Sequence, residues 1–421
     1  LKVQLEVEGA NIPVKEIKLS EDASAVEPGK EELVGEIKQT YGNNVNRIGY
    51  GRRNGFETFQ MNFQALSADE WKKFIGKPAK LTFTLEDGSE VFIDNVFFNS
   101  AHVKLGNPTN ARWDATQPKP TNLLLEKPGY TVSYNTETKI PNWVSWQVNQ
   151  TWTKAREESI TIQFMDDPFL SLTAANPEWP KVNGTVFRNP WVGMDKGHLI
   201  PNRDRNRNVK DAIETYMGTN LIAQSMDNNR LFTEEPLTAS AWFNIEKWIG
   251  NGVEQGKEFY VVAGGLGNNW NSQKKTNVPK FLENPFNQGY TNPTKFQDNI
   301  NIPQWTWKTI VGLPKPGTDI SLQTDVLTYI TPNRAEPGSD AWPIAHPLDN
   351  LVPLDPNDPN DKRDPITSPQ QWRLPETWEV TLTELEELLN ASNPVQFDFL
   401  SHITDNNLRE RLKDKGGYVP F

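Results

Sequence analysis

One histidine of this chain stands in a setting suited to hydrolytic chemistry. Residues 195–198 read DKGH, and Arg203 and Arg205 follow shortly after His198. A neutral imidazole accepts a proton near pH 7, and nearby cations hold an anionic substrate and stabilise developing negative charge. Attack of water on a phosphodiester requires both functions. The segment therefore predicts phosphodiester hydrolysis, with a surface turn at Gly197 among solvated charges as the alternative.

Two further segments with polar side chains lie downstream of this histidine. Residues 217–230 read MGTNLIAQSMDNNR, and residues 242–248 read WFNIEKW, with the apolar spacing of a helix. The insertion between them, 231–240, contains Pro236, and proline is not accommodated in the interior of a helix. We therefore expect a loop in this insertion and, after it, a helix that carries Glu246.

In this order the segments resemble the signature of the DNA/RNA non-specific endonucleases, which are sugar-non-specific nucleases with a ββα-metal active site. The family has a D-R-G-H box, a T-N-x-x-P-Q-like stretch ending in D-x-N, and a helix with W-x-x-L-E. This chain has DKGH, TNLIAQ, DNN and WFNIE. Segments resembling other strands and the last helix of the family extend the similarity over roughly residues 125–412; they lie at 140–146, 259–265, 302–311 and 380–400.

The resemblance implies a metal-assisted mechanism. His198 would be the general base that deprotonates the attacking water, and Asn229 would be the one direct protein ligand of a Mg²⁺ ion, for which Mn²⁺ could substitute. The ion would offset charge on the leaving O3′, and Glu246 would hydrogen-bond its water ligands. Because the insertion before this helix is long, Glu234 or Glu235 could take the place of Glu246. The expected products are oligonucleotides that end in 5′-phosphate.

Other residues of the boxes would support this site. Asn220 is a predicted catalytic residue that shapes the site, Gln224 is predicted to contact substrate and hold the metal-binding segment, and Asp195 would orient the first box. Lys196, also a predicted catalytic residue, stands where the family usually has arginine. Lysine keeps the charge but loses the planar two-pronged fit to phosphate, so we expect lower activity or a rearranged contact.

Arginines are the expected ligands of the substrate phosphates. Arg203 and Arg205 are predicted to bind substrate, and together with Arg207 and Lys210 they form a cationic cluster next to the histidine box. The family has a further phosphate-binding arginine upstream of the box. Arg156 is the candidate for this catalytic position, and a solvated surface stretch around it is the alternative.

Composition limits the classes of function. The 421-residue chain has a net charge of −11, which repels a polyanion overall. DNA and RNA are nevertheless the expected substrates, because a hydrolase requires only a local cationic cleft. The absence of cysteine excludes disulfides and a thiolate zinc site. The sequence also lacks a P-loop, a nucleophile elbow and an apolar run long enough to span a membrane.

Residue patterns predict two parts of the chain. Residues 1–120 show the alternation of apolar and polar residues that is typical of strands, with a hairpin across Asp87-Gly88, and predict a β-rich module of unknown role. A proline-rich linker at 117–122 precedes a domain at 125–421. From the resemblance we expect an α+β fold, a ββα-metal nuclease with a central antiparallel sheet, helices and two insertions at about 266–300 and 333–376.

Two other functions stay open at this point. Lys196 and the acidic charge are compatible with a catalytically impaired nuclease fold that binds nucleic acid or a surface. The large insertions could instead narrow the cleft for small phosphodiesters. Because members of the family are often dimeric and often secreted or periplasmic, and the chain begins at Leu1, we expect an exported protein and consider a homodimer. A protein inhibitor is a further conceivable partner.

Overall fold

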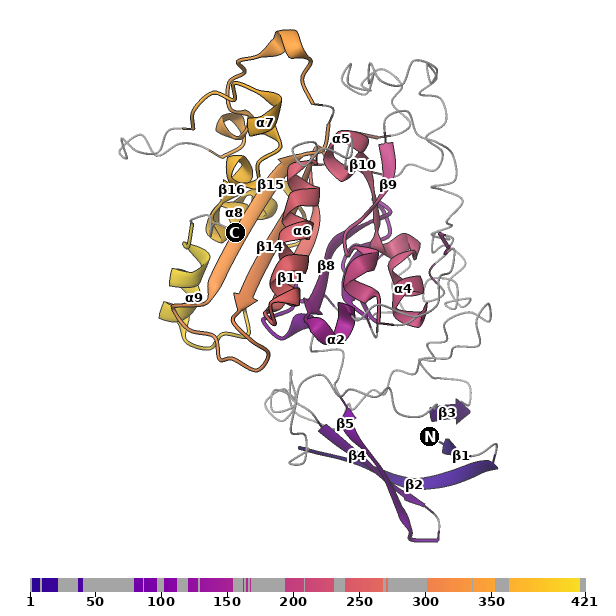
Figure 1. Cartoon of the computed structure of the whole chain (residues 1–421). Coiled ribbons are helices and arrows are strands. Elements are labelled where there is room, and N and C mark those ends of the chain that lie inside the picture. Colours follow the sequence, from indigo (N-terminus) through magenta and orange to yellow (C-terminus); the bar gives the residue numbers. More distant parts are fainter. Residues whose placement is uncertain are drawn as a thin grey trace.

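The structure of the protein is a computed structural model, and its described residues form two large β-sheets and two sheets of two strands each (Figure 1). The two large sheets share no strand. One has five strands and lies near the N-terminus, and the other has seven strands and is covered by helices. The described residues are 2–7, 10–21, 37–40, 79–85, 87–96, 102–111, 120–127, 129–153, 162, 164–165, 167, 194–207, 209–230, 239–267, 270–271, 301–334, 336–352 and 363–416.

The larger sheet is antiparallel throughout, in the strand order β16-β15-β14-β11-β8-β7-β6. Its central strands are rich in β-branched and aromatic residues, which suit a pleated sheet packed on both faces. The strands are β6 (Leu123–Glu126), β7 (Thr131–Asn135), β8 (Ile140–Val148), β11 (Glu258–Leu266), β14 (Trp305–Leu313), β15 (Asp325–Pro332) and β16 (Glu379–Val380).

Each face of this sheet packs against its own apolar cluster, because successive side chains of a strand point to opposite faces. Ile310 of β14 belongs to the cluster that includes Trp242 of helix α6 (Ala241–Glu254). Trp307 of the same strand belongs to the cluster on the other face, with helix α8 (Leu382–Ser392). The sheet is therefore the middle layer between α6 and α8, as Figure 1 shows.

The histidine box lies in a separate two-stranded antiparallel sheet on the α6 side. Strand β9 (Met194–His198) pairs with β10 (Leu221–Ser225), and β10 runs into the short helix α5 (Met226–Asn229), which α6 follows. Two strands followed by helices form the expected ββα unit, so the α+β fold with a large antiparallel sheet is confirmed. Between β9 and β10 the chain forms η3 (Asn202–Arg205), α4 (Val209–Thr215) and η4 (Gly218–Asn220).

Capping side chains define where the two long helices begin. Ser240 accepts a hydrogen bond from the backbone N–H of Phe243 and starts α6, as expected for an N-cap serine. Thr381 and Glu384 form a reciprocal capping box at the start of α8. The helix predicted over 242–248 is therefore confirmed, whereas residues 231–238 of the loop predicted at 231–240 lie outside the described residues.

The five-stranded sheet near the N-terminus is also antiparallel, in the order β3-β1-β2-β4-β5. The predicted hairpin across Asp87 is present: Gly88 has a φ of +83°, which glycine adopts without strain, and Asp87 accepts the backbone N–H of Ser89. The strands are β1 (Lys2–Val7), β2 (Ala10–Glu21), β3 (Ile37–Thr40), β4 (Ala79–Leu85) and β5 (Glu90–Val96).

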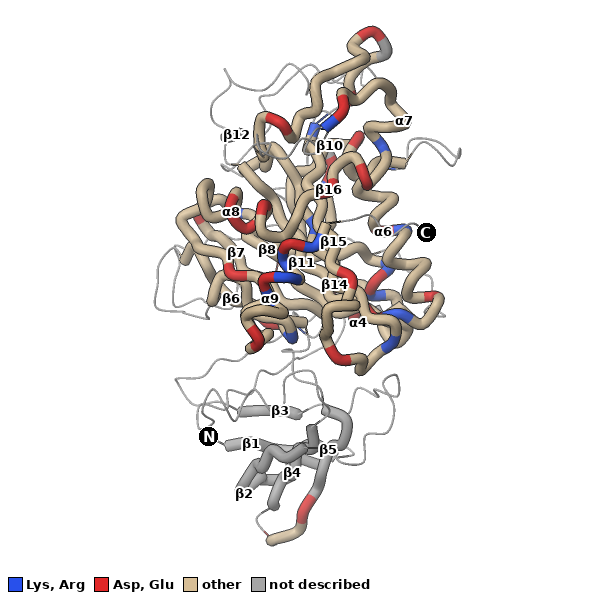
Figure 2. The backbone as a smooth tube through the Cα atoms, turned by 90° about the vertical axis from the view of Figure 1, so that its left-hand side faces the viewer, with Lys and Arg blue, Asp and Glu red and all other residues tan. Residues whose placement is uncertain are grey.

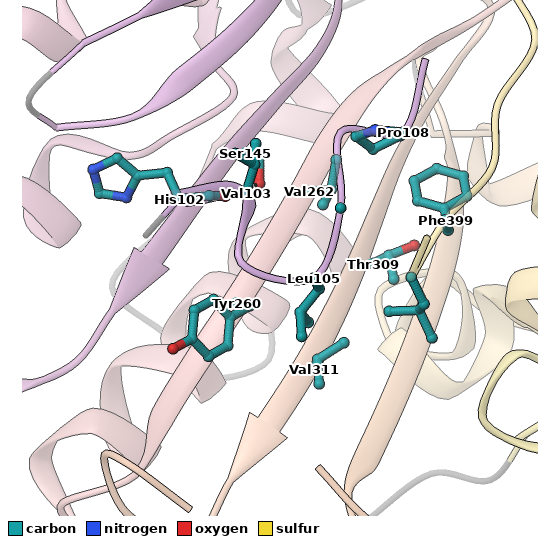
Figure 3. A pocket seen from close by; sticks show the side chains of 12 residues that line it. His102, Val103, Leu105, Pro108, Ser145, Tyr260, Val262, Thr309, Val311 and Phe399 are labelled. Atoms are coloured by element: carbon teal, nitrogen blue, oxygen red, sulfur yellow. Dashed lines mark hydrogen bonds between the residues drawn. The ribbon is translucent and has the colours of Figure 1, made fainter. Parts of the chain in front are cut away.

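A loop that precedes the predicted linker packs on the seven-stranded sheet. In residues 102–111, Thr109 accepts a hydrogen bond from Trp143 Nε1 at 2.8 Å, and the Pro108 carbonyl accepts one from the Asp398 N–H. The loop covers a small cavity of about 20 Å³ between Ser145, Tyr260 and their neighbours (Figure 3), room for about one water molecule. The domain boundary at 117–122 stays a prediction. None of the described helices combines the length and apolarity needed to cross a bilayer.

Candidate active site

Gly197 lies inside strand β9 and not in a turn, so the alternative of a surface turn at this glycine was wrong. A Cβ atom at this position would collide with the side chain of Gln224, which reaches across from the paired strand β10. Gln224 is fully buried, and its Nε2 donates to Asn228 Oδ1 on α5. Position 197 requires glycine because the Gln224 side chain, which links the β9/β10 hairpin to α5, fills the space that a side chain at this position would need.

The two buried amides expected in the site bind other parts of the protein: Asn220 holds backbone groups, and Gln224 holds the Asn228 side chain. Asn220 Oδ1 accepts the Ile200 N–H at 3.0 Å, and its Nδ2 donates to the carbonyls of Ile200 and Thr215. Both Asn220 and Gln224 are 0% exposed. Neither side chain has a surface that a substrate reaches, so they position the loop after β9 and the start of α5.

The His198 ring is enclosed by aromatic side chains. Its centroid lies 4.8 Å from that of Tyr216 and 5.3 Å from that of Phe164. The ring is partly exposed, but Nε2 is covered and has no hydrogen-bond partner among the described residues. Burial lowers the pKa of His198 to about 4, because the charged form loses its hydration. The imidazole is therefore neutral at pH 7 and carries a lone pair or a proton that no described group uses.

Lys196 lies on the same face of β9 as His198, since alternate residues of a strand point the same way. Its Nζ is 4.5 Å from the centroid of the Phe164 ring, a cation–π distance. Phe164 thus contacts both the imidazole and the ammonium group. The box places a cation next to the neutral base, as its composition suggested.

Asn229, the predicted metal ligand, is held by the first residue of the box. Its Nδ2 donates to Asp195 Oδ2 at 3.0 Å. Arg230, the next residue, donates through Nε and Nη2 to both oxygens of the same carboxylate. Asp195 therefore does more than orient its own strand: it connects β9 to the end of α5.

Glu246 lies in a buried charge cluster on α6. Its Oε1 is 3.2 Å from Nζ of Lys308, which rises from β14 and lies 3.8 Å from the centroid of the Trp242 ring. Burial raises the pKa of Glu246, and the charges of Lys308 and Arg203 oppose this shift. Arg203 also approaches Asp204, at 4.0 Å from Nε to Oδ1. Its Nε and Nη2 have no hydrogen-bond partner within the described part of the chain.

Arg205 does not agree with its predicted substrate-binding role. The side chain is 0% exposed and donates to the carbonyls of Gly129, Asp204 and Gln147. Its guanidinium also stacks on Trp152, 4.2 Å from the ring centroid. All three kinds of donor nitrogen are used internally, so Arg205 stabilises the fold.

The remaining arginines of the predicted phosphate-binding set differ in their placement. Arg207 pairs with Asp211 at 2.8 Å and stacks on Trp152. Arg156 lies outside the described residues. Figure 2 shows basic and acidic residues intermingled along the described backbone, so attraction of a polyanion has to come from a few local cations such as Arg203 and Lys196.

The comparisons with known proteins agree with the order of these elements. The family model described as DNA/RNA non-specific endonuclease matches residues 114–358. The chain belongs to this family. Endonuclease activity and metal dependence follow from this membership.

Curated relatives of the chain carry nuclease names. A nuclease of Nostoc sp. (strain PCC 7120 / SAG 25.82 / UTEX 2576) is 29% identical over 310 residues, which are 73% of this chain and 83% of the relative. The mitochondrial nuclease EXOG of Homo sapiens is 22% identical over 139 residues, 32% of this chain and 33% of that protein. A crystal structure of the EndoG/EndoGI complex covers 72% of this chain and 91% of its own, with a TM-score of 0.43 and 16% identity.

The side chains available as metal ligands suit a hard cation that keeps most of its water ligands. No group of three or more His, Cys, Asp or Glu side chains gathers anywhere in the described ranges. Asn229 nevertheless presents a carbonyl oxygen, because its amide nitrogen faces Asp195. A single oxygen ligand fits Mg²⁺, which sheds water reluctantly.

Four residues near the predicted site were not identified from the sequence. Lys308 had a detectable signal, since a lysine inside an otherwise apolar strand has to find a buried partner. Arg230 directly follows the DNN stretch, and its role depends on the side-chain direction at the end of α5. Phe164 and Tyr216 carry no signal, because aromatic residues outside the boxes are ordinarily core residues.

Replacement of Gly197 by alanine tests the contact with Gln224. We expect Gly197→Ala to destabilise the protein by about 1–3 kcal/mol through overpacking and to lower nuclease activity, and Gly197→Ala combined with Gln224→Ala to recover part of the loss. Thermal unfolding and plasmid cleavage measure both effects. Gly338→Ala is the control, because nothing lies within 4 Å of the added Cβ. A Gly197→Ala protein that unfolds and cleaves like wild type would contradict the assignment.

The structural role of Arg205 can be separated from substrate binding. An ammonium group cannot serve three carbonyls, so Arg205→Lys should cost on the order of 2–3 kcal/mol of unfolding free energy, with KM for DNA unchanged in the folded protein. Arg207→Lys, at a partly exposed ion pair, should cost less than about 1 kcal/mol. Denaturant unfolding and steady-state kinetics measure these quantities. A raised KM with unchanged stability would instead show that Arg205 binds substrate.

Proposed function

We propose that this protein hydrolyses phosphodiester bonds of DNA and RNA in a Mg²⁺-dependent reaction that leaves 5′-phosphate ends, with His198 as the general base. The observation that carries the proposal is the state of His198: a neutral imidazole whose Nε2 has no partner among the described residues. A structural histidine buried in a core normally has its ring nitrogens hydrogen-bonded. An unused nitrogen beside a cation is suited to accept a proton from water.

The aromatic enclosure sets how this base works. Phe164 and Tyr216 shield the ring and keep it neutral at physiological pH. Catalysis requires that Nε2 be uncovered when substrate binds, so that a water molecule reaches it. The proton of this water passes to Nε2, and the hydroxide attacks phosphorus in line with the leaving O3′. Lys196 attracts the phosphate to the same face of β9.

Asn229 would hold the cation through Oδ1. The bound ion supplies charge stabilisation for the phosphate and the leaving oxygen. Mg²⁺ is the proposed metal, with Mn²⁺ as a substitute, because the ligand is a neutral oxygen. Asp195 keeps this oxygen turned outward by accepting the amide N–H.

Glu246 and Arg203 complete the charge arrangement. Lys308 pairs with Glu246 and favours its ionised form, which would accept hydrogen bonds from water ligands of a bound cation. Nε and Nη2 of Arg203 have no hydrogen-bond partner among the described residues, and a phosphate oxygen would satisfy them. The further phosphate ligand proposed at Arg156 completes the set.

Substitution of His198 tests the proposed base. We expect His198→Ala to lower kcat on supercoiled plasmid and on total RNA by at least about 100-fold, because general-base catalysis contributes about 10²–10⁴-fold. His402→Ala is the control, because this variant also removes a histidine but one outside the proposed site, where its ring contacts the Lys104 carbonyl. EDTA should abolish cleavage by the wild-type protein. Cleavage by the His198→Ala protein at the wild-type rate would exclude this role, and preferential hydrolysis of a small chromogenic diester would favour a small-substrate phosphodiesterase.

The pH dependence of activity tests the environment of the base. Because the neutral form is active and the pKa of His198 is about 4, kcat/KM should persist to about pH 5 and fall as the pH drops through the folded pKa. An exposed histidine would lose activity near pH 6.5. As the pH falls, His198 becomes protonated in the unfolded chain before it does in the folded protein. The free energy of unfolding therefore decreases as the pH falls from about 6.5 to about 4. An acid limb near pH 6.5, with folding verified by tryptophan fluorescence, would contradict the account.

A further inference from the structure

We infer that Arg230 is a positioning residue for the metal ligand: its two-pronged pairing with Asp195 holds the carboxylate that turns the Asn229 amide toward the cation. The inference rests on the proposed role of Asn229 as the ligand.

The orientation of the Asn229 amide follows from what Asp195 can do. An ionised carboxylate only accepts hydrogen bonds, so the group 3.0 Å from Asp195 Oδ2 has to be the amide nitrogen, Nδ2. The carbonyl Oδ1 therefore points the other way, and it has no hydrogen-bond partner among the residues that the structure describes. Rotation about the last torsion of asparagine has broad minima. Without Asp195, the amide could present its nitrogen to the cation instead.

Asp195 needs a second partner to hold the amide in one plane. One hydrogen bond from Asn229 leaves the carboxylate free to rotate, whereas Arg230 engages both of its oxygens. A bidentate guanidinium fixes the plane of the carboxylate as well as its position. Oδ2 is shared by Arg230 Nε and Asn229 Nδ2, so the two adjacent residues converge on one atom.

The backbone of Arg230 is itself fixed. Its N–H donates to the Met226 carbonyl at 3.0 Å and closes α5, and its carbonyl accepts the Ser240 N–H at 3.3 Å. Ser240 in turn caps α6. The guanidinium therefore extends from a fixed point between the two helices toward β9.

Global stability does not explain this pair. The Arg230 side chain is 53% exposed and that of Asp195 is 10% exposed, and exposed ion pairs contribute only about 0–1 kcal/mol. The pair instead matters through its geometry. Mutation of residues that hydrogen-bond a metal ligand typically lowers metal affinity about 10–100-fold.

Two effects of removing Arg230 have opposite signs. If Arg230 acts through its charge alone, its removal tightens cation binding, because a positive neighbour disappears and the charge of Asp195 is exposed. If Arg230 positions Asp195 and Asn229, its removal weakens cation binding. The sign of the change in Mn²⁺ affinity decides between them without any measurement of turnover.

The test is titration of the full-length protein with Mn²⁺ alone, followed by EPR of the free ion. Arg230→Met should weaken Mn²⁺ binding about tenfold, and Arg230→Lys, which keeps the charge without the two-pronged fit, should also weaken it. Arg409→Met is the control. It removes an arginine of α9 (Asn406–Lys413) that pairs with Glu410 and with Asp398. It should bind Mn²⁺ like wild type. Thermal unfolding verifies that each variant is folded.

Asn229→Ala separates failure of this inference from failure of the proposed function. Weakened Mn²⁺ binding by Asn229→Ala together with unchanged or tighter binding by the two Arg230 variants would overturn the positioning role and leave the ligand intact. Unchanged Mn²⁺ binding by Asn229→Ala would overturn the proposed ligand, and the inference with it. Weakened binding by Asn229→Ala and by both Arg230 variants, with wild-type binding by Arg409→Met, is the result we expect.

Discussion

The contact of Gln224 with Gly197 is the constraint on which the site depends. Gln224 can lie across β9 only where the opposite strand lacks a side chain, and this fixes how β9 and β10 pair. A slip by one residue would turn every side chain of the box to the other face. The register keeps Lys196 and His198 together on one face and leaves Asp195 on the other, where Asn229 and Arg230 reach it. Gln224 also binds Asn228. One side chain therefore determines both the register of β9 and β10 and the position of α5 relative to them.

Burial then determines the chemistry of each ionisable group. The pKa of His198 falls because its ring is enclosed by aromatic residues, and the imidazole is kept neutral without a charged partner. Glu246 differs from His198 because it has charged neighbours. Burial raises the pKa of Glu246, and the positive charges of Lys308 and Arg203 oppose this rise. The sheet supplies both environments: strand β14 provides Lys308 to α6 and Thr306 to Asn228 on α5. This middle layer therefore contacts both α6, which carries Glu246, and α5, which carries the proposed metal ligand Asn229.

The family, the α+β fold and the helix of Glu246 could be predicted from the ordered boxes, because each box combines unusual residue types at a set spacing. The direction of individual side chains could not. Arg203 and Arg205 have similar neighbours in the sequence, yet Arg205 is buried against three carbonyls, whereas Nε and Nη2 of Arg203 have no hydrogen-bond partner in the described ranges. Burial of this kind depends on residues distant in the chain, such as Gly129 and Gln147. For the same reason the sequence did not show the burial of Gln224, which does not agree with its predicted substrate contact. Its predicted role in holding the metal-binding segment agrees with the hydrogen bond to Asn228.

Crystals of the protein soaked in Mn²⁺ and examined by anomalous diffraction provide the most direct test of the metal site. We predict a peak in direct contact with Asn229 Oδ1, with the Asn229 nitrogen still on Asp195. Nearby Asp227 offers an alternative oxygen, since its Oδ1 is buried without a partner within the described residues. A peak on Asp227, or one away from α5 altogether, would contradict the account.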